Sequence, residues 1–124
     1  MKTQIVCKEA PAGIGPYSQA VKKDGMLFVS GQTGFDMETG KIPEGVTEQA
    51  KRCLDHIKNI ITEAGGTMND VVKCSVFLKD LNEFAAMNEV YSSYFEKPYP
   101  ARTTIEAARL PMDVRVEIDA IVML

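Results

Sequence analysis

The 124-residue sequence contains no tryptophan, one histidine and three cysteines. Cys7, Cys53 and Cys74 are odd in number and form no C-x-x-C pair, so we expect neither a disulfide framework nor a zinc site. His56 is the only histidine of the chain. Its neighbours predict a helix, and His56 lies outside the apolar face of that helix. We therefore interpret His56 as a solvent-exposed residue outside any Ser-His or Cys-His nucleophile pair.

Long hydrophobic runs and clusters of basic residues are also missing. No apolar stretch reaches the roughly 18 residues of a membrane span, and the first nine residues lack the core of a signal peptide. The 14 lysines and arginines are scattered and the formal net charge is −3, whereas proteins that bind nucleic acid usually carry a basic patch. We expect a cytoplasmic protein that binds neither membranes nor nucleic acids.

Length and composition indicate a single domain over residues 1–124. Hydrophobic residues make up 45% of the chain and charged residues 25%, as in ordinary globular proteins. A domain of this size buries about two-thirds of the surface that its unfolded chain exposes, which is enough for a core without disulfides. It is too small for a deep cleft of its own, and such chains often build a pocket between subunits.

Apolar spacing predicts two helices. From Thr47 to Ala64 the apolar residues recur at steps of three and four, with Thr47 as the N-cap and Gly65-Gly66 as the stop. A second helix follows Asp80 and ends at residues 97–100, which contain two prolines. Its aromatic residues have helical spacing, so they indicate core packing and not a surface for stacking bases.

The other apolar segments are typical of strands. Turn residues punctuate residues 1–45, in which 26–30 is the clearest strand and 20–22 its hairpin partner. β-branched residues predict a strand over 71–78. Its side chains directed toward the helices are expected to be Val72, Cys74, Val76 and Leu78.

Two more strands close the chain. In residues 101–107, Arg102 and Thr104 share one face because side chains alternate along a strand. Residues 114–124 alternate between apolar and polar, which places Glu117 on the face away from the core.

The order of elements indicates an α+β fold in which two helices cover one face of a mixed sheet. The opposite face then stays uncovered. We expect that face to contain Arg102, Glu117, Lys73, Ser75, Ile121 and Met123. Because this mixture suits contact with another subunit, we expect a homo-oligomer.

Arg102, Glu117 and Tyr17 could bind a small anion or activate water. An arginine offers paired donors to a carboxylate, although the residues alone favour an Arg102 that pairs with Glu106 or Glu117. Glu117 is either a solvated strand residue or, in a closed pocket near Arg102, a group that activates water. Tyr17 follows Gly15-Pro16 and lies either on the surface or against a partner.

Some stretches of the chain are specific enough to indicate a protein family. They are A-P-A-G-I-G-P-Y-S-Q-A (10–20), V-S-G-Q (29–32), D-L-N-E-F (80–84) with N-E-V-Y (88–91), and P-A-R (100–102) through A-R-L-P (108–111) into V-E-I (116–118). Together they closely resemble the Rid (YjgF) family of reactive enamine/imine deaminases. The resemblance implies a chorismate-mutase-like fold and a homotrimer whose sheets form a central barrel with a pocket at each interface.

The resemblance also implies a reaction that needs no metal or organic cofactor. Small 2-imino acids such as 2-iminobutanoate and 2-iminopropanoate would be hydrolysed to 2-oxo acids and ammonia. Arg102 would bind the carboxylate, Glu117 would position the attacking water, and Tyr17 would reach in from the neighbouring subunit. The other implied positions are Ser30, Gly31, the backbone amide of Thr104, and Asn88 as local support.

Three positions depart from the family's common pattern: Thr104 replaces a cysteine, Thr103 a serine and Met112 a lysine. A thiol at position 104 is therefore excluded, whereas a contact through the backbone amide survives. Two alternatives stay open. One is a non-catalytic trimer that binds 2-oxo acids; the other is a ribonuclease or translation inhibitor, which the acidic composition disfavours.

Overall fold

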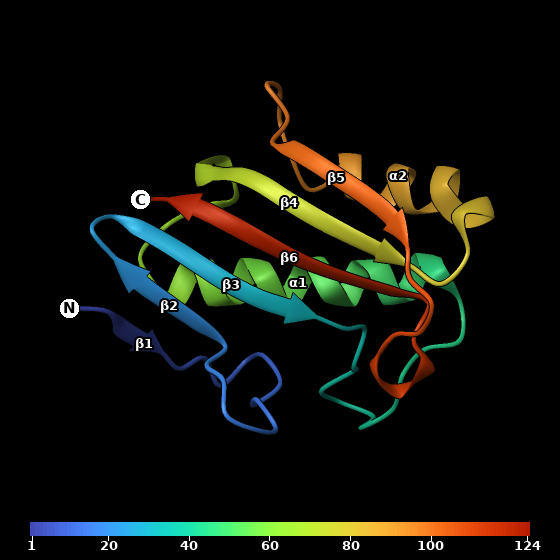
Figure 1. Cartoon of the computed structure of the whole chain (residues 1–124), viewed down its shortest axis with the longest axis horizontal. Helices are drawn as coiled ribbons and strands as arrows, with labels where there is room; N and C mark the ends of the chain where they lie inside the picture. The colour runs from blue at the N-terminus through green and yellow to red at the C-terminus, as the bar shows by residue number, and fades with distance from the viewer.

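A computed structural model describes residues 1–124 and shows one six-stranded sheet with two helices on the same face (Figure 1). The strands are β1 (Thr3–Ile5), β2 (Ala20–Lys23), β3 (Met26–Gln32), β4 (Val71–Leu78), β5 (Ala101–Glu106) and β6 (Val116–Met123). The helices are α1 (Val46–Glu63) and α2 (Phe84–Ser92), with short 3₁₀ turns η1 (Met68–Asp70), η2 (Leu81–Glu83) and η3 (Pro111–Asp113). The expected α+β arrangement is confirmed.

The order of strands across the sheet is β1-β2-β3-β6-β4-β5. All neighbours are antiparallel except β4 and β5, which are parallel. Parallel neighbours need a crossover, and the chain supplies it through η2 and α2. The mixed sheet therefore has β1 and β5 as its edges, and β6 lies in its interior (Figure 1).

The core lies between the sheet and the helices. Leu54, Ile57 and Ile61 on α1 have no exposed surface, and full burial of one such side chain contributes about 1.5–3 kcal/mol. Alternate residues of β6 from Val116 to Val122 are buried against them, as expected. All three cysteines are free and buried. None of the helices combines the length and apolar character that a membrane span needs.

Three details of the elements differ from expectation. Helix α2 ends at Ser92 and does not reach residues 97–100. Helix α1 begins at Val46 with Gly45 as its N-cap, so Thr47 is not the cap. In β4, Val71 is buried and Val72 is 42% exposed, because the pairing with β6 shifts register between Val71 and Lys73. The irregularity reverses the alternation at that end of the strand. The predicted inward positions of Cys74, Val76 and Leu78 are confirmed.

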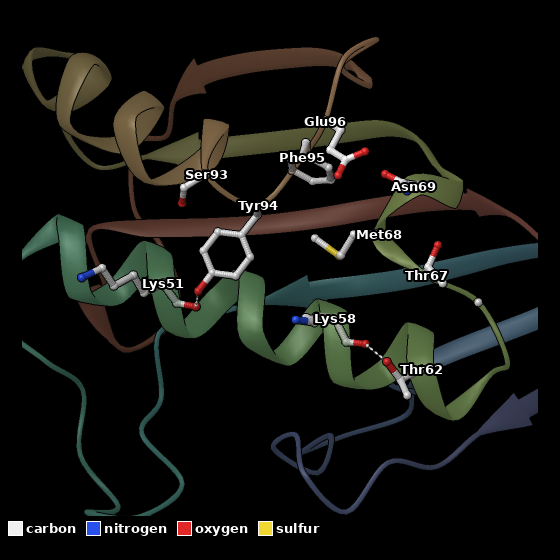
Figure 2. Close-up of a pocket in the computed structure, with 11 residues that line it drawn as sticks. Lys51, Lys58, Thr62, Thr67, Met68, Asn69, Ser93, Tyr94, Phe95 and Glu96 are labelled. Carbon is white, nitrogen blue, oxygen red and sulfur yellow. Dashed lines mark hydrogen bonds between the residues drawn. The ribbon is translucent and has the colours of Figure 1, made fainter.

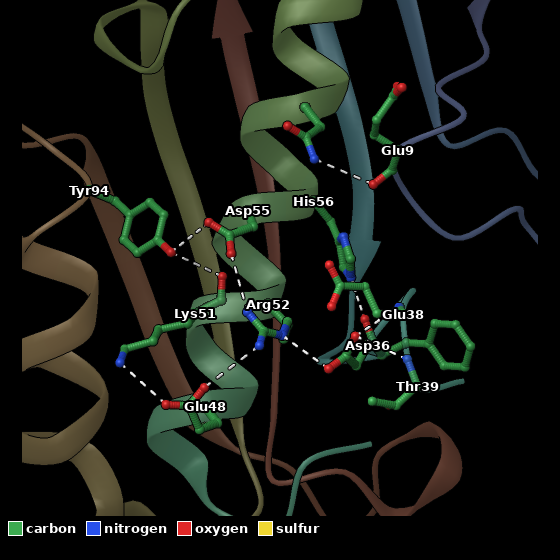
Figure 3. A network of polar contacts seen from close by, with 12 residues as sticks. Glu9, Asp36, Glu38, Thr39, Glu48, Lys51, Arg52, Asp55, His56 and Tyr94 are labelled. Atoms are coloured by element: carbon green, nitrogen blue, oxygen red, sulfur yellow. Dashed lines mark hydrogen bonds and ion pairs between the residues drawn. The ribbon is translucent and has the colours of Figure 1, made fainter. Parts of the chain in front are cut away.

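The prediction that His56 is exposed is wrong. The side chain is 3% exposed and its Nε2 lies 2.6 Å from the carbonyl oxygen of Phe35 (Figure 3). Burial lowers the pKa of His56, against the opposing effects of the Phe35 carbonyl and Asp55. The loop after β3 covers this flank of α1, and helical periodicity alone does not reveal such a cover. His56 therefore anchors the loop as a neutral imidazole.

Polar contacts fix the same loop from its outer side. Arg52 on α1 lies 3.7 Å from carboxylate oxygens of both Asp36 and Asp55, and 3.9 Å from Glu48 (Figure 3). The Asp36 carboxylate also accepts a hydrogen bond from the main-chain N–H of Glu38 at 2.8 Å. The loop that follows β3 is thus tied to α1 by His56 and Arg52 together.

Candidate active site

Glu117 lies on the sheet face opposite the helices, directly against Gly31. A Cβ placed on Gly31 would lie 2.9 Å from Cδ of Glu117, which is shorter than real Cβ contacts, and 3.2 Å from Cγ. The pairing of β3 with β6 is irregular between Val29 and Gln32, and this irregularity includes Gly31. Only a glycine leaves room for the Glu117 carboxylate at this point.

The environment of Glu117 favours its protonated form more than water does. Burial raises its pKa, and the charge of Asp119 two residues away raises it further. The carboxylate accepts no hydrogen bond from the chain, so its oxygens are free to bind a ligand or a water molecule. A half-buried carboxylate with a raised pKa suits general base catalysis near neutral pH.

Glu117 faces a hollow of about 710 Å³ on the uncovered side of the sheet. The walls come from the loop at residues 11–17, the end of β3 and the loop after it, and the turn that contains Met112. Tyr17, Ser30, Gly31 and Glu117 all line it. Four of the seven site residues expected from the sequence therefore lie around one hollow.

Buried Gln19 holds the loop that carries Tyr17. Its Oε1 accepts a hydrogen bond from the N–H of Cys7 at 2.8 Å, and its Nε2 donates to the carbonyl oxygens of Pro11 at 2.8 Å and Cys7 at 3.0 Å. Ser30 Oγ donates to the carbonyl oxygen of Ser18 at 2.7 Å. Sequence reasoning missed Gln19, because its partners are main-chain groups up to 12 residues away.

Tyr17 itself is 56% exposed at the rim of the hollow. Its hydroxyl accepts a hydrogen bond from the N–H of Ile14 at 3.3 Å. A Cβ on Gly13 would lie 3.1 Å from its ring, so the glycine permits the close contact between the loop and the ring. The phenol is therefore held in place while most of its surface remains available to a ligand or another chain.

Arg102 lies elsewhere. It pairs in register with Cys74 of β4, whose buried side chain faces the helices, so Arg102 is on the helix side of the sheet. The prediction that it shares the uncovered face with Glu117 is wrong. The strand alternation was correct, but the pairing with β4, which decides the face, is not visible in the local sequence.

The guanidinium of Arg102 has no carboxylate partner. None of the ion pairs in the chain includes it, and Glu106 instead accepts a hydrogen bond from the N–H of Leu81 at 2.9 Å. Its Cζ lies 4.7 Å from the ring centroid of Tyr91 and 5.5 Å from that of Phe84. Pairing of Arg102 with Glu106 or Glu117, which the sequence alone favoured, is therefore not observed.

Thr104 and Asn88 lie with Arg102. Thr104 is two residues along β5 on the same face, beside Val76. Asn88 stands four residues after Phe84 and three before Tyr91, which places it on the same side of α2 as these rings. The remaining three expected site residues thus form a second group at the β5 edge.

One copy of the chain does not bring the two groups together. Strand β4 separates β5 from β6, which corresponds to about 10 Å between the backbones of the two outer strands. Arg102 and Glu117 also project from opposite faces of the sheet. A site that uses both residues consequently needs a second copy.

A further hollow, of about 650 Å³, lies between α1, residues 66–69 and residues 93–96, which follow α2 (Figure 2). Its hydroxyl groups have partners nearby: Tyr94 donates to Asp55 at 2.7 Å, and Thr62 donates to the carbonyl oxygen of Lys58 at 2.9 Å. Its one carboxylate, Glu96, is exposed, whereas Glu117 is half-buried, and we do not assign this hollow as the active site.

One group of side chains could approach a metal ion, namely Cys7, Glu9 and Glu63. It lies outside both hollows. Burial raises the pKa of the Cys7 thiol, and a protonated thiol is a poor metal ligand. This group is therefore not part of the candidate site.

The chain is similar to known proteins over nearly all of its length. The family model described as endoribonuclease L-PSP matches residues 7–124. A RutC family protein of Pyrococcus abyssi is 54% identical over 121 residues, covering 97% of this chain and 95% of the relative. The 2-iminobutanoate/2-iminopropanoate deaminase of Escherichia coli K12 is 44% identical over 124 residues, covering 98% and 97%. The crystal structure of E. coli TdcF with bound serine superposes with a TM-score of 0.94 at 42% identity, covering 98% of each chain.

Proposed function

Since the chain belongs to the endoribonuclease L-PSP (YjgF/Rid) family, we propose that it hydrolyses small 2-imino acids, such as 2-iminobutanoate and 2-iminopropanoate, to 2-oxo acids and ammonia. The proposal rests on the observation that two charged side chains are left without polar partners in the chain. Arg102 has no carboxylate partner, and Glu117 accepts no hydrogen bond. These are the two groups that a carboxylate-bearing imine and an attacking water require. The E. coli relative with the deaminase name supports this choice of substrate.

Arg102 binds the substrate carboxylate in this proposal. Two parallel N–H donors of a guanidinium match the two carboxylate oxygens, and such charge-assisted pairs are about twice as strong as neutral hydrogen bonds. No acidic side chain of the same chain competes for those donors. The bound serine of the TdcF structure, an amino acid with a carboxylate, is consistent with a site for this class of ligand.

Glu117 acts on water. Its carboxylate accepts a proton from the water while the water oxygen bonds to the imine carbon, which is already electrophilic when the imine nitrogen is protonated. Glu117 then returns this proton to the amino nitrogen of the resulting carbinolamine. Ammonia leaves as the C–N bond breaks, and the hydroxyl group gives up its proton to Glu117 as it becomes the C=O group of the 2-oxo acid. Orientation of the two reactants is then the main task of the site, and we propose that neither a metal nor an organic cofactor takes part.

Assembly completes the site in this proposal. The β5 edge of one copy, with Arg102, lies against the hollow of the next copy, with Glu117 and Tyr17. A head-to-tail contact gives a ring when its rotation closes, and we propose a homotrimer with the sheets on the inside as a barrel. Phe28, Ile105 and Met123 are 44%, 47% and 53% exposed, and assembly would bury such apolar surface.

The test is to generate 2-iminopropanoate in situ with an amino acid oxidase and to follow its decay. Wild-type protein should accelerate the decay, and Arg102→Ala should lose about 10²-fold or more in kcat/KM. Lys23→Ala is the control, because Lys23 is an exposed basic residue at the end of β2 that does not line the hollow. Equal rates for Arg102→Ala and wild type would refute the assignment.

Two further outcomes would point to another function. Tight binding of 2-oxobutanoate in calorimetry without any turnover would indicate a 2-oxo-acid-binding protein. Cleavage of RNA by purified wild type that is lost in Glu117→Gln would indicate the ribonuclease activity in the description of the family model.

A further inference from the structure

Two aromatic rings, those of Tyr91 and Phe84, lie against the Arg102 guanidinium. We propose that Tyr91, together with Phe84, is a positioning residue that fixes the Arg102 guanidinium for the substrate carboxylate. The inference rests on the proposed function for its consequence in catalysis. Its structural part, that these rings hold Arg102 in place, stands on the geometry of the chain.

The contact distances support an attraction between the cation and the rings. A guanidinium within about 6 Å of a ring centroid is attracted by the negative face of the ring, and both distances meet this condition, at 4.7 Å for Tyr91 and 5.5 Å for Phe84. Stacking uses the flat face of the guanidinium and leaves its N–H donors free. A carboxylate partner would occupy the donors that the substrate needs.

Tyr91 is itself rigidly placed. The side chain is 4% exposed, and its ring centroid lies 4.7 Å from that of Phe95 with the planes tilted by 44°. Phe84, by contrast, is 40% exposed at the start of α2. Tyr91 is therefore the fixed support, and Phe84 is a second, more exposed ring in contact with Arg102.

The hydroxyl of Tyr91 is not what holds the arginine. It is buried and has no nitrogen or oxygen partner. Besides burial, the Cys74 thiol raises the pKa of this hydroxyl and the charge of Arg102 lowers it. Burial raises the pKa of Tyr91, so it remains a neutral phenol and forms no ion pair with Arg102. Tyr91→Phe consequently keeps the supporting ring, whereas Tyr91→Leu removes it.

The first experiment needs no substrate. In nuclear magnetic resonance spectra of the whole protein, the Nε–H group of Arg102 should show an upfield ring-current shift and slow local motion. Tyr91→Phe should preserve both, and Tyr91→Leu should move the signal toward the position of a free arginine. An unchanged Arg102 signal in folded Tyr91→Leu would overturn the inference, whether or not the protein hydrolyses imines.

The second experiment measures the catalytic consequence. Tyr91→Leu should raise KM for 2-iminopropanoate about tenfold with a smaller change in kcat, since a carboxylate contact acts in both the bound substrate and the transition state. Tyr91→Phe should stay within about twofold of wild type. The effect of Tyr91→Leu should vanish when Arg102 is already alanine, because a positioning residue acts through its partner.

An undiminished effect of Tyr91→Leu in the Arg102→Ala background would indicate a general structural role and overturn the inference. Absence of imine turnover in wild type would instead refute the proposed function alone. In that case the Arg102 signal in the spectra still decides whether Tyr91 positions the guanidinium.

Discussion

Gly31 lies so close to Glu117 that a single added carbon would collide with the carboxyl group: the Cβ would be 2.9 Å from Glu117 Cδ. The two residues belong to neighbouring strands, β3 and β6, and meet where the pairing of these strands is irregular. The absence of a side chain at position 31 leaves the space that the carboxyl group of the proposed base occupies. It also makes Gly31 a sensitive position for activity.

Gly31→Ala should displace the Glu117 carboxylate and lower kcat/KM for 2-iminopropanoate. A misplacement of about 1 Å in a catalytic group can cost on the order of 10²-fold in rate. Steady-state kinetics and thermal unfolding should be measured together, with Gly45→Ala as the control because nothing lies within 4 Å of a Cβ at that position. Full activity of a folded Gly31→Ala would show that the contact has no catalytic importance.

Glu117→Gln should abolish activity and yet stabilise the fold near neutral pH. Burial and, to a smaller extent, Asp119 raise the pKa of Glu117 above its ordinary value of 4.5. Between pH 4.5 and the raised pKa, the folded state therefore keeps a proton on Glu117 that the unfolded state has released. The stabilising contribution of the protonated group is complete below pH 4.5 and is lost as the pH rises through the raised pKa.

The stability difference between Glu117→Gln and wild type should therefore grow upward from pH 4.5 and then level off. Denaturant unfolding across this range measures it. Glu38→Gln, at an exposed position, should show no such trend, and a flat difference for Glu117→Gln would contradict the burial argument.

His56 should make the fold sensitive to mild acid. Burial lowers its pKa from the ordinary 6.5, so the unfolded state binds more protons than the folded state between these two values. The stability that neutral His56 contributes is complete above pH 6.5 and is lost as the pH falls through the lowered pKa.

His56→Gln retains an N–H donor for the carbonyl oxygen of Phe35 but cannot be protonated in this range. Its unfolding free energy should therefore depend less on pH below 6.5 than that of wild type. Identical pH profiles for the two proteins would mean that His56 does not titrate on unfolding. The charged residues near His56 that also act on its pKa are Asp55, Arg52 and Asp36.

Gln19→Leu should loosen the loop at residues 11–17. The substitution leaves the buried N–H of Cys7 and the carbonyl oxygen of Pro11 without partners, and such unmet groups cost about 1–3 kcal/mol each. We expect a loss of about 2–4 kcal/mol in unfolding free energy and faster hydrogen exchange in the loop. Gln4→Leu, at an exposed position of β1, is the control and should change neither.

Local sequence was sufficient to predict the elements that face the core. The alternation along residues 116–123 correctly directed Val116, Ile118 and Val122 inward and Glu117 outward, because the two faces of a strand differ by a period of two. The apolar spacing of α1 likewise identified its buried stripe. Motifs such as P-A-R at residues 100–102 and V-E-I at 116–118 identified the family.

Only the tertiary structure decided how these elements meet. The burial of His56 depends on a loop some 20 residues earlier in the chain, and the face on which Arg102 lies depends on its pairing with Cys74. Periodicity is a local property, whereas register and loop packing join residues that are distant in sequence. For this reason the sequence determined which side chains carry the proposed chemistry, and the structure determined that Arg102 and Glu117 of one chain are on opposite faces of its sheet.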